Sequence, residues 1–302
     1  MRLVFMGSAE LACPCLEAVA RMPGHTVAGV VTQPDKPKGR ALQLAPPPVK
    51  VTAQHLGLPV IQPVKIRDAV AELAAWRPDL IVVVAYGQLL PPVILDLPAR
   101  GCLNVHTSLL PRWRGASPIQ HAILAGDAET GVTTMFLNER MDAGDIILQR
   151  ATPIGPAETS GQLHDRLAHL GAALLVETLA LPVFPRRAQE ESRVTLAKKL
   201  AKEDGVVDWT RPAVEIERWI RAFDPWPGSH TFAGAELLKL WRGEVTAQGR
   251  GLPGTVNADL VVTTGAGGLR LLEVQPAGGR RMSAAEFLRG RAALAGTVLR
   301  RG

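Results

Sequence analysis

The chain has 302 residues, of which 47% are hydrophobic and 21% are charged, and its formal net charge is +6. This composition excludes a disordered chain, and the length suits about two globular domains. No apolar run approaches the roughly 18 residues of a membrane span, and the first residues lack the apolar core of a signal peptide. We therefore expect a cytoplasmic protein with no membrane partner.

The three cysteines are Cys13, Cys15 and Cys102, an odd number without CxxC or zinc-ligand spacing. Disulfides persist mainly in oxidising compartments, where they hold together small domains with paired cysteines. We expect all three to be packed free thiols, as in a reducing compartment.

The first half alternates short β-branched runs with helical patterns. Strands that are apolar along their whole length are typical of a parallel sheet covered by helices on both faces. The predicted fold class is therefore α/β, with a doubly wound, mostly parallel, Rossmann-like sheet. The predicted strands are residues 2–6, 26–32, 80–85, 103–106, 131–137 and 146–150, and the predicted helices are residues 11–22, 69–76 and 160–181.

The second half differs in pattern. Residues 186–206 are rich in charge and lack a broad apolar face, which predicts an exposed basic linker. After it we expect an amphipathic helix at residues 214–223 and a small β-barrel, because short strand patterns recur at residues 237–241, 260–264 and 269–274. The predicted domains are residues 1–185 and 207–302, joined by this linker.

The excess positive charge lies entirely in the second part of the chain. Residues 1–185 hold 15 basic and 15 acidic side chains, whereas residues 186–302 hold 19 and 13. This asymmetry favours a half that binds a polyanion, usually nucleic acid, beside a neutral catalytic half. A basic surface kept only for solubility is the alternative, and composition leaves it open.

Asn104 and His106 lie two residues apart on a predicted strand, so both side chains point to one face near its C-terminal end. Ligands of open α/β sheets bind at that end. An amide and an imidazole directed at one point could donate hydrogen bonds to a carbonyl oxygen that becomes an oxyanion, as acyl transfer requires. A histidine with a purely structural role is the alternative, and spacing does not exclude it.

Asp142 lies in a separate glycine-containing turn and could orient His106, although its position also fits a plain turn aspartate. Cys102 shares the parity of His106, but four residues of strand separate the two by about 13 Å, too far for a Cys–His nucleophile pair. The histidines lack metal-ligand spacing, and no G-x-G-x-x-G follows the first strand. We therefore predict neither a metal nor a dinucleotide.

Three motifs occur together: Asn104-Val105-His106, the run Ser108 to Gln120 that begins Ser-Leu-Leu-Pro, and Asp142-Ala143-Gly144-Asp145. With this combination the chain resembles the folate-dependent formyltransferase family. The resemblance implies 10-formyltetrahydrofolate as formyl donor and no metal, with Asn104 and His106 stabilising the oxyanion and Asp142 orienting His106. The folate-binding residues that it implies are Ser108, Leu109, Leu110, Pro111, Tyr86 and Gly87.

Residues 32–50 resemble an inserted loop that the tRNA-acting members of this family use against the acceptor stem, although Ala41-Leu42-Gln43 stand where further lysines are familiar. Residues 220–227 and 272–277 resemble the OB-like C-terminal domain of those members. The implied acceptor is the amino group of methionine on initiator tRNA. The expected tRNA-binding residues are Lys36, Lys38 and Arg40 in the loop and, from the charge distribution, Lys198, Lys199 and Lys202 in the linker.

Other acceptors remain open at this point. Amino sugar nucleotide formyltransferases resemble the chain in the same three motif residues and a C-terminal barrel, and a 10-formylfolate hydrolase would use water instead. The loop around Arg40 and the basic linker favour tRNA. A non-catalytic RNA-binding module is disfavoured because all three motif residues are present. We expect a monomer, since neither heptads nor an apolar interface stripe is apparent.

Overall fold

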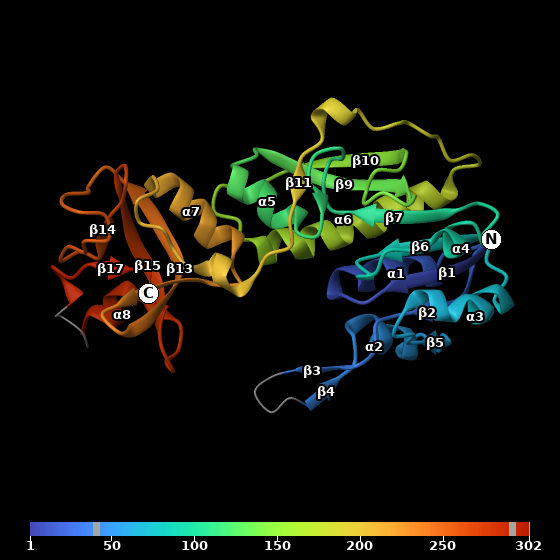
Figure 1. The fold of residues 1–302 in the computed structure, drawn as a ribbon, viewed down its shortest axis with the longest axis horizontal. Coiled ribbons are helices and arrows are strands. Elements are labelled where there is room, and N and C mark those ends of the chain that lie inside the picture. The colour runs from blue at the N-terminus through green and yellow to red at the C-terminus, as the bar shows by residue number, and fades with distance from the viewer. Residues whose placement is uncertain (39–42, 290–293, 302) are drawn as a thin grey trace. The chain divides into compact units, whose positions relative to one another are not determined.

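The computed structural model describes residues 1–38, 43–289 and 294–301 (Figure 1). The chain forms two compact units, the first of residues 1–118, 129–153 and 164–197 and the second of residues 119–128, 154–163 and 198–302. These units differ from a simple division at residue 185. Two short segments of the first half group with the later residues, and residues 186–197 group with the earlier ones.

The first unit is built on a seven-stranded sheet in the order β10-β9-β7-β6-β1-β2-β5. Strands β1, β2, β5, β6 and β7 run parallel, and β9 and β10 add an antiparallel edge. This arrangement confirms the predicted mostly parallel α/β class. The strands are β1 Arg2–Gly7, β2 Thr26–Val31, β5 Val60–Ile61, β6 Leu80–Val84, β7 Cys102–His106, β9 Glu129–Phe136 and β10 Ile146–Pro153.

The sequence of the central strands explains their position. Strand β6 reads Leu-Ile-Val-Val-Val and is buried at every residue, which suits β-branched side chains covered on both faces. Trp76 packs so closely against β2 that a Cβ on Gly29 would lie 2.4 Å from its indole ring, so that position requires glycine. The helices within residues 1–180 are α1 Cys13–Ala20, α2 Pro48–His55, α3 Val70–Ala75, α4 Pro92–Leu95, α5 Pro118–Ala125 and α6 Ser160–Ala180. Nearly all of α5 and the start of α6 group with the second unit.

A short hairpin that the sequence patterns did not reveal follows β2. Strands β3 Lys36–Lys38 and β4 Gln43–Ala45 pair antiparallel. At its base, Lys50 Nζ lies 2.9 Å from both carboxylate oxygens of Asp35, and Gln62 Nε2 donates to the same carboxylate over 2.7 Å. The hydrogen bond from Gln62 and then that from Lys50 lower the pKa of Asp35. The expected tRNA loop therefore begins from a fixed base, whereas Arg40 lies outside the described residues.

The second unit contains α7 Ala213–Ala222, whose Ile216 and Ile220 are buried in the core of this unit. Its antiparallel sheet has the order β14-β15-β13-β12-β17, with β16 on β15. Thr255 bridges to Val298 and Val256 bridges to Val262, so the two edges of the sheet curl toward each other as expected of a small barrel. The remaining elements are β12 Ser229–Ala233, β13 Glu236–Thr246, β14 Val261–Thr263, β15 Gly268–Pro276, β16 Met282–Ser283, α8 Ala284–Arg289 and β17 Leu299–Arg300.

Among the described residues, no helix combines the length and the apolar character needed to cross a bilayer.

Candidate active site

A cavity of about 510 Å³ lies in the first unit. Its wall combines residues of β6 and β7, the segment 85–90 after β6, and the segment 137–142 after β9. This volume falls in the range that binds a drug-sized molecule, and the carboxyl ends of the parallel strands are where such ligands bind. The cavity brings Asn104, His106 and Asp142 together with Tyr86 and Gly87.

Asn104 and His106 are placed by the pairing of β7 with its neighbours. Asn104 is 8% exposed and His106 is 7% exposed, and both line the cavity, as their shared strand face predicted. Within the described residues the Asn104 side chain has no hydrogen-bond partner. Its amide is therefore available to donate to a ligand.

The imidazole of His106 is held from two sides. Its Nε2 donates to the carbonyl of Trp113 over 2.9 Å, and its Nδ1 lies 3.8 Å from Oδ2 of Asp142. The second distance is that of an ion pair and exceeds a hydrogen bond. Since Nε2 carries a hydrogen, Nδ1 is protonated only in the imidazolium form. The same carboxylate oxygen accepts a hydrogen bond of 2.8 Å from the backbone of Gly115.

Unusual backbone conformations gather around the cavity. Ala85, Trp113 and Asp142 adopt left-handed conformations with φ of 45°, 61° and 49°. Such conformations cost energy in residues with a side chain, and they concentrate at functional sites. Gly144, two residues after Asp142, lies so close to Phe136 that a Cβ would stand 1.9 Å from its carbonyl oxygen. The turn that carries Asp142 therefore depends on a glycine.

Tyr86 and Gly87 line the cavity, and their contact with folate stays a prediction. Ser8 donates to the Tyr86 carbonyl over 3.1 Å, which ties this loop to the end of β1. Burial raises the pKa of Tyr86 to about 12, and its hydroxyl has no partner among the described residues. Tyr86 therefore presents an uncharged wall.

The run Ser108 to Pro111 is not brought to the cavity wall. Ser108 is fully buried, and its hydroxyl donates to the Arg112 carbonyl over 2.6 Å. Leu110 packs against Met135 and Ile146. These residues form the turn that leads from β7 to Trp113, and the contact of Ser108, Leu109, Leu110 and Pro111 with folate stays a prediction.

The thiols of the chain have a structural character. Cys13, Cys15 and Cys102 are free thiols, as expected. Burial raises the pKa of Cys102 to about 12, so this thiol does not ionise into a nucleophile. Over residues 1–38, 43–289 and 294–301, no three His, Cys, Asp or Glu side chains gather as metal ligands.

Among the described residues, none of the expected tRNA-binding residues lines this cavity. Lys198, Lys199 and Lys202 are exposed, and no described residue pairs with their ammonium groups. Lys36 is exposed on β3, where Lys38 also lies.

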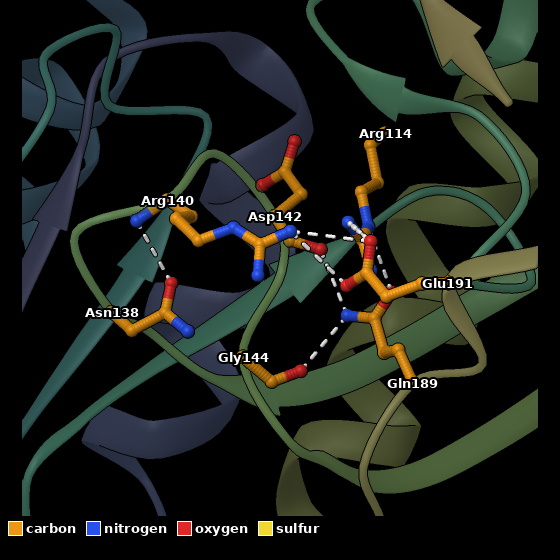
Figure 2. A network of polar contacts seen from close by, with 7 residues as sticks. All are labelled: Arg114, Asn138, Arg140, Asp142, Gly144, Gln189 and Glu191. Carbon is orange, nitrogen blue, oxygen red and sulfur yellow. Dashed lines mark hydrogen bonds and ion pairs between the residues drawn. The ribbon is translucent and has the colours of Figure 1, made fainter. Parts of the chain in front are cut away.

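The sequence patterns did not predict a network of polar contacts that includes the backbone of Asp142 (Figure 2). Gln189 Nε2 donates to the carbonyls of Asp142 and Gly144, each over 2.8 Å, and Gln189 Oε1 accepts from Arg114 Nε over 2.9 Å. Glu191 lies 3.2 Å from Arg114 and 3.1 Å from Arg140, which lines the cavity. Gln189 and Glu191 come from the segment predicted as an exposed linker, and no local pattern in the sequence marks them.

The Rossmann-like sheet thus brings an amide, an imidazole and a carboxylate together in one cavity. Residues 1–179 match the model of the formyl transferase family, and residues 199–292 match that of the formyl transferase C-terminal domain. The chain belongs to the formyl transferase family.

Two relatives that share a name match nearly the whole chain. The methionyl-tRNA formyltransferase of Geobacter sulfurreducens is 46% identical over 299 residues, which cover 96% of this chain and 94% of the relative. That of Roseobacter denitrificans is 48% identical over 304 residues, or 99% of each chain. The N-formyltransferase of Helicobacter canadensis, solved with folinic acid and dTDP-3-aminofucose, shares the fold with a TM-score of 0.67 at 17% identity and covers 93% of this chain and 99% of its own.

Proposed function

We propose that the protein transfers the formyl group of 10-formyltetrahydrofolate to the α-amino group of methionine on initiator tRNA, giving formylmethionyl-tRNA for translation initiation. The cavity that joins the free amide of Asn104 to His106 and Asp142 carries this proposal. The acceptor is supported by relatives of this name that match nearly the whole chain.

Activation of the attacking amine does not require a strong general base. An α-amino group has a pKa of about 8 or below, so roughly a tenth of it or more is already neutral and nucleophilic near pH 7. The larger task is to stabilise the oxyanion that forms when the amine adds to the formyl carbon. The Asn104 amide donates to this oxygen, and His106 in its imidazolium form adds a second donor at Nδ1.

Proton and bond changes balance without a metal or a covalent intermediate. A bond forms between the amine nitrogen and the formyl carbon, and the bond from this carbon to the folate nitrogen breaks. The amine loses one proton and the leaving folate nitrogen gains one. Asp142 stabilises the imidazolium of His106 from 3.8 Å while the charge shifts, and so orients the ring.

The substrates are assigned to different surfaces. The folate ring lies against Tyr86, Gly87 and the rest of the loop after β6, in the cavity of about 510 Å³. The tRNA backbone contacts Lys198, Lys199 and Lys202, and the hairpin with Lys36, Lys38 and Arg40 contacts the acceptor stem. We also infer a monomer that works in the cytoplasm, where free thiols persist.

The direct test is incubation with 10-formyltetrahydrofolate and methionyl initiator tRNA, with formylated product measured by mass spectrometry. Parallel reactions contain an amino sugar nucleotide or no acceptor. Formylation of the tRNA, with no reaction in either parallel mixture, supports the proposal. Preferential formylation of the sugar, or folate deformylation without an acceptor, would replace it with one of the rival activities.

A further inference from the structure

We propose that Gln189 and Thr195 form a clamp that positions His106 by holding the two groups that contact its imidazole ring; the catalytic consequence rests on the proposed function. These two groups are the carboxylate of Asp142 and the carbonyl of Trp113. Gln189 and Thr195 are positioning residues, since neither lines the cavity.

The first arm of the clamp is Gln189. One amide nitrogen bridges the carbonyls of Asp142 and Gly144, which fixes the turn on both sides of Ala143. Arg114 donates to the amide oxygen and thereby determines which end of the amide faces the turn. Because Asp142 is 47 residues away in the chain, this contact exists only in the folded protein.

Arg114 is itself held in place. Its side chain is 5% exposed, and a buried guanidinium without a partner is costly. Glu191 supplies this partner at 3.2 Å, and the hydrogen bond from Arg114 keeps the pKa of Glu191 below its usual range. Gln189 and Glu191 therefore both hold the buried Arg114, which orients the amide of Gln189 (Figure 2).

The second arm is Thr195. Its hydroxyl accepts a hydrogen bond of 2.9 Å from the backbone of Trp113, and its carbonyl accepts one of 2.9 Å from the backbone of Arg114. Strand β11 Leu196–Ala197 then pairs in parallel with β8 Arg114–Gly115. Trp113 has a left-handed backbone, and its carbonyl accepts from Nε2 of His106. Thr195 thus holds the residue that fixes one side of the imidazole.

Both ring nitrogens of His106 consequently face groups that one short segment holds. Displacement of a reacting group by about 1 Å can lower a rate by roughly a hundred-fold, so loosening either arm should reduce turnover more than substrate binding.

The kinetic test uses variants that remove a single polar contact. Gln189→Leu and Thr195→Val should lower kcat by about 10- to 100-fold while KM for folate and tRNA changes less than about three-fold. Thr195→Ser keeps the hydroxyl and should restore turnover. Glu190→Gln is the matched control, because Glu190 is exposed and its carboxylate contacts Ser192 and Arg193 rather than either arm. Unchanged kcat in both Gln189→Leu and Thr195→Val would overturn the proposal.

A double-mutant cycle separates positioning from general stability. If Gln189 acts through Asp142, Gln189→Leu should cost almost nothing in single-turnover rate once Asp142→Asn is present. Equal costs in both backgrounds would show that Gln189 acts elsewhere.

A readout independent of activity separates failure of the clamp from failure of the proposed function. Nitrogen-15 spectra of the histidine rings, with His106 assigned by its loss in His106→Gln, should show a single environment with a proton fixed on Nε2, in either charge state of the ring, in the wild type and in Thr195→Ser. They should show a changed or averaged form in Gln189→Leu and Thr195→Val. Identical His106 spectra in all these proteins would contradict the clamp, whichever acceptor the wild type formylates.

Discussion

The segment between α6 and α7 contains two regions of similar composition, which belong to different units and differ in their contacts. Up to Ala197, Gln189, Glu191 and Thr195 contact groups around the active-site cavity. After Ala197, three lysines are exposed without an acidic partner in the described structure. Both regions are charged and lack an apolar face, and their composition predicted one linker. The difference shows that the function of a charged side chain depends on whether the fold supplies a partner.

Substitutions in the two regions should therefore have different effects. Changes that reach His106 should lower turnover, and changes after Ala197 should weaken tRNA binding in a salt-dependent manner. The predictions below test this contrast, beginning with the largest effect.

The largest effect should come from the residues at the reacting atoms. Asn104→Ala and His106→Ala should each lower turnover by roughly a hundred- to a thousand-fold, because one oxyanion donor contributes about 3 to 4 kcal/mol to the barrier. Affinity for tRNA should remain close to that of the wild type. Single-turnover formylation and filter binding measure the two quantities. Near-normal turnover in either variant would remove that residue from the mechanism.

The second effect concerns Lys198, Lys199 and Lys202. Replacing all three by Gln should flatten the plot of log affinity against log salt by up to about one unit for each phosphate that is no longer neutralised. When salt rises from about 50 to 200 mM, three such phosphate contacts account for a loss of affinity of roughly 30-fold or more, and the triple variant should no longer show this part of the loss. All tRNAs should be affected alike, since phosphate contacts do not read sequence. Lys65→Gln, a change of an exposed lysine in the first unit, is the control, and an unchanged slope in the triple variant would mean that these lysines are only solvated surface.

A smaller effect is expected at Arg40, which lies outside the described residues but follows the hairpin strand β3. Arg40→Ala should reduce efficiency on initiator tRNA modestly, because a single phosphate contact is lost, and leave folate binding unchanged. Steady-state formylation with initiator tRNA and equilibrium folate binding test this. Equal efficiency with and without the arginine would assign the tRNA contact to other residues.

The smallest effect is the pH dependence of Glu191. Its pKa in the folded protein lies below the usual value, chiefly through the hydrogen bond from Arg114. Its ionised form therefore stabilises the fold fully above the usual value of about 4.3, and this contribution is lost as the pH falls through the lowered pKa. The stability advantage of the wild type over Glu191→Gln should thus be present at neutral pH and shrink in acid. The midpoints of urea unfolding of the two proteins, at neutral pH and in acid, measure this difference in stability. A difference that does not change with pH would contradict the assignment.

The sequence by itself predicted most strands of the main sheet and the helices α1, α3 and α6, but not β5, α2, α4 or α5, and it supplied the hypothesis for the residues of the candidate site. Uniformly apolar, β-branched runs predicted strands such as β6, because only burial on both faces stabilises them. Strand parity placed Asn104 and His106 on one face, since side-chain direction alternates strictly along a strand. The glycine-containing turn marked Asp142, and the structure adds the reason, because Gly144 has no space for a side chain.

Only the tertiary structure decided which distant residues meet these groups. Gln189 and Thr195 lie 47 and 82 residues from the positions that they hold, and hydrogen bonds of that span leave no periodic signal in a sequence. The hairpin of β3 and β4 escaped notice because its Lys-Pro-Lys strand has no apolar face to bury. Ser108 to Pro111 are likewise placed by long-range contacts, which direct Leu110 into the core rather than to the cavity wall. Local sequence patterns indicate which residues are buried and which way their side chains point. The hydrogen-bond partners of a polar group depend instead on which distant segments the fold brings next to it.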